Sequence, residues 1–204
     1  MAEGPPFVIL ALPRSRTAWL AYWLTYGGWL CGHEQLRYCR SMEDVRSWLA
    51  MPKTGTVETA AAPFWRLIPA DVRIVTVRRP KVEVVRSTIA LGYNARAAEE
   101  TIGRLDRKLD QVEARRSVVR VEFDELRTAE GAKRLWEAVL PLPFDECWYH
   151  ALAALNVQYS AELMTRYVIA HEKQLMEFRA EAKLAHRLRR KWVKPLKVRQ
   201  KELV

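Results

Sequence analysis

The sequence predicts an α/β fold with a mainly parallel sheet. Short apolar segments recur along the first 123 residues, and most of them are followed by a longer segment with helical spacing of its apolar residues. Strands that alternate with helices form parallel sheets covered by helices. The chain has 204 residues, of which 50% are hydrophobic and eight are tryptophan. This composition is sufficient for one core of ordinary size.

The first strand and the helix after it are the most informative part of the chain. Residues 7–12 form the apolar run FVILAL, which ends at Pro13 and is typical of a buried parallel strand. Helical spacing of apolar residues begins near Ser15 or Arg16. The helix is expected to end at Gly27-Gly28, since glycine is favoured at the C-terminal cap.

The remaining elements follow from the same patterns. We expect strands at 53–59, 73–77 and 118–123, which are rich in β-branched residues. Residues 29–36 are assigned to no element. We expect helices at 41–49 with Ser41 as the N-cap, at 60–67, 82–91, 95–115, 126–139 and 145–155, and from 160 to about 193. The alternating charges of 95–115 predict an exposed helix.

The turn after the first strand has the groups of an anion-binding site. Arg14, Ser15, Arg16 and Thr17 lie where the strand passes into the helix. The first turn of a helix has unpaired N–H groups and the positive end of the helix dipole. Arginine and hydroxyl side chains add donors suited to phosphate. The motif is not a Walker A loop, because the segment has no lysine and no glycine before Gly27.

A second candidate phosphate site follows the strand at 73–77. Arg78-Arg79-Pro80 is followed by Ser87 on the next predicted helix. An arginine at the end of a strand and a serine on the next helix can bind one phosphate from two sides. Ligands of α/β proteins bind beyond the carboxyl ends of the strands, so we expect this segment and the first turn to lie at one site.

The first turn resembles the 5′-phosphosulfate loop of sulfotransferases. Residues 12–20, LPRSRTAWL, are similar to the Y-P-K-S-G-T-T-W type of loop, which holds the 5′-phosphosulfate of 3′-phosphoadenosine 5′-phosphosulfate (PAPS). By this match Arg14 stands in the position of the catalytic lysine, and Ser15 and Thr17 take the hydroxyl positions. Arg16 stands where many members have glycine.

The second segment resembles the 3′-phosphate motif of the same family. Arg79 and Ser87 have its spacing of eight residues, whereas the R-x-P pattern of the family points to Arg78. We favour Arg79 and keep Arg78 beside it. Residues 142–159 resemble the late helix region of small bacterial and phage sulfotransferase-like proteins. The R-K-G-x-x-G-D-W stretch of the family is absent.

The resemblance implies a fold and an activity. The fold is a P-loop-like three-layer α/β domain at residues 1–160, followed by a C-terminal helix and basic tail at 161–204. The activity is transfer of the sulfuryl group of PAPS to a hydroxyl or amine of a small-molecule or glycan acceptor, without a metal ion. Such transfer needs a general base. His33 or Glu34 resembles the base of several sulfotransferase groups, and Glu58 is a rival candidate at the end of a predicted strand.

Two other functions are compatible with the sequence. A nucleotide-dependent phosphotransferase is disfavoured, because the Walker lysine and a strand-terminal Asp for Mg²⁺ are missing. A non-catalytic nucleic-acid-binding or assembly protein on a degenerate nucleotide-binding fold is favoured by the charge. The net charge is +10, and residues 180–204 hold nine Lys or Arg against two Glu. This segment could also bind an anionic membrane surface, or support self-association through the C-terminal helix.

The remaining composition predicts a cytoplasmic protein. Three cysteines without C-x-x-C spacing predict reduced thiols, with no zinc site and no disulfide. No apolar run approaches the ~20 residues that span a bilayer, and the N-terminus does not have the pattern of a signal peptide.

Overall fold

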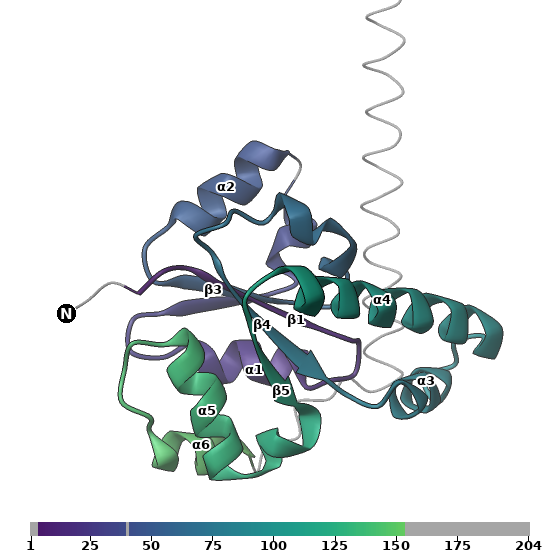
Figure 1. Ribbon diagram of the computed structural model, residues 1–204. Helices are drawn as coiled ribbons and strands as arrows, with labels where there is room; N and C mark the ends of the chain where they lie inside the picture. Colours follow the sequence, from purple (N-terminus) through teal and green to yellow (C-terminus); the bar gives the residue numbers. More distant parts are fainter. Residues whose placement is uncertain (1–3, 40, 154–204) are drawn as a thin grey trace, which may run out of the picture. The chain divides into compact units, whose positions relative to one another are not determined.

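The computed structural model describes residues 4–39 and 41–153, and these form one parallel sheet with helices on both faces (Figure 1). Within them the strand order is β2-β3-β1-β4-β5, with every neighbouring pair parallel. All described residues belong to one compact unit. The α/β fold with a parallel sheet is therefore confirmed. The helix expected from 160 to 193 and the basic tail lie outside the described residues.

Four of the strands lie where the sequence predicts them. These are β1 (Phe7–Ala11), β3 (Thr54–Glu58), β4 (Arg73–Arg78) and β5 (Val118–Glu122). The sequence analysis missed β2 (Leu30–His33). It is a short edge strand that pairs with β3 only, and Leu30 is exposed, so it lacks the apolar run of the central strands.

Six α-helices lie in the described part of the chain. They are α1 (Thr17–Leu24), α2 (Met42–Ala50), α3 (Lys81–Ile89), α4 (Ala95–Arg115), α5 (Ala129–Val139) and α6 (Glu146–Ala153). Ser41 caps α2 in a capping box with Asp44, as expected. The helix expected at 126–139 begins at Ala129, because Thr128 accepts a hydrogen bond from the N–H of Gly131 and caps it.

Three short 3₁₀ segments follow strand ends. They are η1 (Gln35–Tyr38) after β2, η2 (Ala62–Leu67) after β3 and η3 (Phe123–Arg127) after β5. The sequence predicts a helix at 60–67, and the structure has the 3₁₀ turn η2 there. These segments lie at the carboxyl edge of the sheet, next to the candidate site residues.

The two faces of β1 divide the core into two layers. Phe7, Ile9 and Ala11 pack with α1, α5 and α6, which are rich in aromatic residues. Val8 and Leu10 pack with α2, η2, α3 and α4 on the opposite face (Figure 1). The sequence analysis was wrong to expect α4 to be simply exposed, since one face of that helix is buried in the second layer.

The topology places the loop after β1 at a switch point. The chain leaves β1 towards α1 on one face, whereas it leaves β3 and β4 towards η2 and α3 on the other face. Because β1 lies between β3 and β4, the loop after β1 turns to one face of the sheet and the loops after its two neighbours turn to the other. Open α/β sheets bind ligands at such points. None of the helices in the described ranges has the length and apolar character needed to cross a bilayer.

Candidate functional site

The loop between β1 and α1 is strained and turns a serine into the interior. Arg14 and Arg16 have φ angles of 64° and 58°, in the left-handed region. A side chain with a Cβ costs about 1–2 kcal/mol there. Glycine adopts this conformation without that cost, whereas both of these positions are occupied by arginine.

Ser15 lies between the two strained arginines. Its side chain is fully buried, and its Oγ has no hydrogen-bond partner within residues 4–39 and 41–153. A buried hydroxyl without a partner costs about 1–3 kcal/mol. The loop therefore contains a spare hydrogen-bond donor in the turn that precedes α1, which begins at Thr17.

The segment after β4 contacts this loop directly. The Nε of Arg14 donates to the Oγ of Ser87 on α3 at 3.1 Å. The guanidinium of Arg79 donates to the carbonyl oxygen of Arg14 and pairs with Glu83 at 3.2 Å. Burial lowers the pKa of Arg14, and the positive charge of Arg79 lowers it further. The structure thus brings Arg14, Arg79 and Ser87 together.

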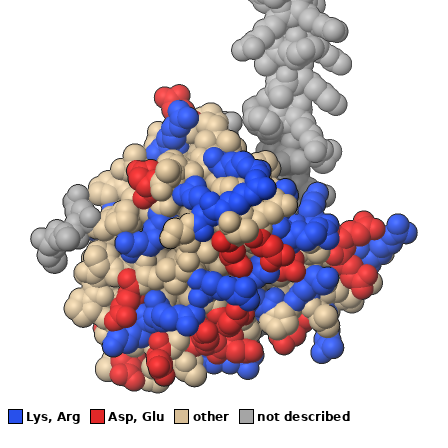
Figure 2. All heavy atoms as spheres, viewed as in Figure 1, with Lys and Arg blue, Asp and Glu red and all other residues tan. Residues whose placement is uncertain are grey.

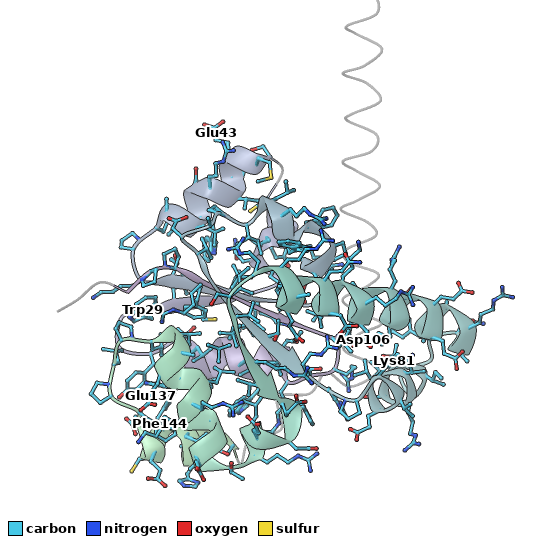
Figure 3. All side chains as sticks on the ribbon, in the orientation of Figure 1. Trp29, Glu43, Lys81, Asp106, Glu137 and Phe144 are labelled. Carbon is cyan, nitrogen blue, oxygen red and sulfur yellow. The ribbon has the colours of Figure 1, made fainter. Side chains whose placement is uncertain are left out.

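The structure places Arg78 elsewhere. Its guanidinium pairs with three carboxylates of α4, those of Asp106 at 3.0 Å, Asp110 at 2.6 Å and Glu113 at 3.7 Å. Figure 3 marks Asp106 on α4, and Figure 2 shows acidic and basic side chains interspersed over this part of the surface. Successive residues at a strand end point to opposite faces, which is why Arg78 and Arg79 diverge.

His33 connects β2 to the loop. Its Nε2 lies 3.2 Å from the Oγ1 of Thr17 in the first turn of α1. The pKa of His33 is lowered, primarily because burial disfavours the imidazolium, while Glu34 opposes this effect and Arg37 adds to it. The imidazole is therefore neutral near pH 7 and is able to accept a proton.

Glu34 is held by β3 and not by the loop. It has a left-handed φ of 56°, and its Oε1 accepts hydrogen bonds from the N–H of Thr59 at 2.9 Å and from its Oγ1 at 2.6 Å. The side chain is buried. The carboxylate is thus fixed at the edge of the sheet, with one of its oxygens already occupied.

Glu58 is the more deeply buried carboxyl group. Only 2% of it is exposed, and its Oε1 accepts from the Oγ1 of Thr56 at 2.6 Å and from the N–H of Leu36 at 2.8 Å. Its pKa is raised to about 7, primarily by burial and also by the charge of Glu34. The two hydrogen bonds and the charge of Arg37 act in the opposite direction and lower the pKa. The carboxyl group therefore changes its protonation state near neutral pH rather than in the acidic range.

Three residues at this edge were missed by the sequence analysis. Thr59 donates hydrogen bonds to Glu34. In η3, the ring of Phe123 lies beside the guanidinium groups of Arg79 and Arg127, and the charge of Arg127 acts on Arg16. Each of them follows the end of a strand, which is the signal that could have drawn attention to them. The site is also lined by Arg16, whose guanidinium lies over the ring of Trp19 at 5.2 Å and contacts the carbonyl oxygen of Leu126 at 3.5 Å.

Comparisons with known proteins add no assignment to this geometry. No protein-family model matches the chain, and no curated protein matches its sequence. In the described part of the chain, no group of three or more His, Cys, Asp or Glu side chains is placed to hold a metal ion.

Proposed function

We propose that the protein is a PAPS-dependent sulfotransferase on a P-loop-like fold. The observation that carries the proposal is the hydrogen bond between Arg14 and Ser87. It joins the segment that resembles a 5′-phosphosulfate loop to the segment that resembles a 3′-phosphate motif. The two segments are 73 positions apart in the sequence, and they meet at the switch point of the sheet.

The roles of the loop residues follow from their positions. The buried hydroxyl of Ser15 and the N-terminal N–H groups of α1 would bind the 5′-phosphate. Arg79 and Ser87 would bind the 3′-phosphate, because Arg78 is paired with α4. In the transfer, the acceptor attacks sulfur and the bond from sulfur to the 5′-phosphate oxygen breaks. Negative charge develops on that oxygen, and the guanidinium of Arg14 would stabilise it.

His33 is the general base that the geometry favours. Its contact with Thr17 places the imidazole against the loop, and its lowered pKa keeps it neutral at pH 7. One carboxylate oxygen of Glu34 is occupied by Thr59, and Glu58 is buried beneath it in β3. The imidazole would take the proton of the acceptor hydroxyl or amine as the bond to sulfur forms.

Isothermal titration calorimetry tests this proposal. Adenosine 3′,5′-bisphosphate and 5′-AMP are titrated into the full-length protein and into Ser87→Ala. A sulfotransferase site binds the bisphosphate at micromolar or lower Kd, binds 5′-AMP much more weakly, and loses most of that difference in Ser87→Ala. Equal affinities for the two nucleotides in the wild type would refute the proposal and favour a phosphotransferase. Binding of neither nucleotide would favour the nucleic-acid-binding alternative.

A further inference from the structure

The carboxyl edge of the sheet gathers more positive charge than the two phosphate motifs account for. The guanidinium carbon of Arg79 lies 4.4 Å from the ring centroid of Phe123, and that of Arg127 lies 5.5 Å from the same centroid. Phe123 and Arg127 begin and end η3, the turn that follows β5. The fold therefore brings Arg127, from the end of η3, and Arg79, from the segment after β4, to the same aromatic ring.

These arginines also act on the phosphate loop. The pKa of Arg16 is lowered first by burial and also by the charge of Arg127, although Tyr149 opposes this effect. The charge of Arg79 lowers the pKa of Arg14 in the same way. Like charges placed this close repel one another, which costs stability in the absence of a counter-charge. The arrangement is that of a site for a ligand with several negative charges.

The existing carboxylate partner of Arg127 is weak. Arg127 pairs with Asp124 at 3.2 Å, and both side chains are more than half exposed, at 61% and 66%. Exposed pairs of this kind contribute about 0–1 kcal/mol. Arg127 can therefore exchange this partner for a ligand at little cost. Stacking on Phe123 leaves the N–H groups in the guanidinium plane available for phosphate oxygens.

We propose that Arg127 is a further ligand of the 3′-phosphate, which it binds together with Arg79 and Ser87. The inference rests on the proposed function, since it assumes that the 3′-phosphate lies beside Arg79. A phosphate monoester carries about −1.5 to −2 charges at pH 7. Arg79 is already paired with Glu83, Ser87 is neutral, and Arg14, which contacts Ser87, is assigned to the 5′ group, so Arg127 would supply the further charge that balances the phosphate.

The test compares the preference for the 3′-phosphate among four proteins. The preference is the Kd of 5′-AMP divided by the Kd of adenosine 3′,5′-bisphosphate, measured by calorimetry for the full-length wild type, Arg127→Gln, Arg127→Lys and Arg96→Gln. Arg96 is the matched control, because it is an exposed arginine in a pair with Glu100 on α4. Loss of one charged hydrogen bond to phosphate lowers the preference about tenfold in Arg127→Gln. Arg127→Lys is expected to retain part of it, and Arg96→Gln all of it.

Two results would overturn the inference while leaving the proposed function intact. The first is a preference for the 3′-phosphate that differs by less than about twofold between the wild type and Arg127→Gln. The second is equal weakening of both nucleotides in Arg127→Gln, which would place Arg127 at the 5′ group instead. A wild type without any preference would overturn the proposed function itself, and this inference with it. Thermal unfolding of each variant confirms that the exposed substitutions leave the fold unchanged.

Discussion

Replacement of Glu58 by glutamine is expected to remove a pH-dependent loss of stability. Glu58 is 2% exposed and its pKa is raised from 4.5 to about 7. The pKa of this acid is higher in the folded protein than in the unfolded chain. The folded state therefore binds more protons than the unfolded state between pH 4.5 and about pH 7. The stabilisation from the protonated carboxyl group is complete below pH 4.5 and is lost as the pH rises through 7. At 1.36 kcal/mol per pH unit, the full loss is about 3 kcal/mol.

Glutamine keeps the acceptor but cannot ionise. Its Oε1 can still accept from Thr56 and Leu36, so Glu58→Gln should resemble the protonated wild type. The free energy of unfolding is measured by urea titration at pH 5, 6, 7 and 8. Between pH 5 and pH 8, the wild type should lose about 2–3 kcal/mol relative to Glu58→Gln. Glu137→Gln is the control, since Glu137 is an exposed carboxylate on α5 (Figure 3).

The control should differ from the wild type by a nearly constant amount across this pH range. A constant difference for Glu58→Gln as well would refute the reasoning, because it would mean that Glu58 ionises in the folded protein as easily as in the unfolded chain. A larger loss at acidic pH than at alkaline pH would have the wrong sign and would refute it equally.

Four further substitutions test other parts of the structure. Arg78→Gln should lower the free energy of unfolding by about 1–3 kcal/mol, because the carboxylates of α4 lose their partner. Arg79→Gln should mainly weaken the binding of adenosine 3′,5′-bisphosphate. Urea unfolding and calorimetry of both variants separate the two effects. Gly55→Ala should destabilise the protein by several kcal/mol in thermal unfolding, because its Cβ would lie 2.2 Å from the ring of Phe7. Ser41→Ala should cost about 1 kcal/mol in urea unfolding through loss of the α2 cap.

The sequence was sufficient to predict the central strands and the polar turn between β1 and α1. Residues 7–12 form a continuous apolar run and residues 73–77 are rich in β-branched residues, because both faces of these strands are buried. The loop could be recognised because its donors are consecutive in the sequence. The edge strand β2 could not be found in this way, because its conformation depends on pairing with β3 and its own residues are partly exposed.

The contacts between segments required the structure. The sequence places Arg78 and Arg79 next to each other before Pro80, and only the contacts of each side chain at the end of β4 show that Arg78 faces α4. The binding of Glu34 by Thr59 depends on the pairing of β2 with β3, which joins residues 25 positions apart. The approach of Arg79 and Arg127 to the ring of Phe123 depends in the same way on β5 lying next to β4.

The orientation of the bound nucleotide tests the proposed function most directly. We would determine a crystal structure of the full-length protein with adenosine 3′,5′-bisphosphate. The proposal predicts that the 5′-phosphate contacts Ser15 and the N-terminus of α1, and that the 3′-phosphate contacts Arg79 and Ser87. A nucleotide bound with its 3′-phosphate in solvent, or bound away from the carboxyl ends of β1 and β4, would contradict it.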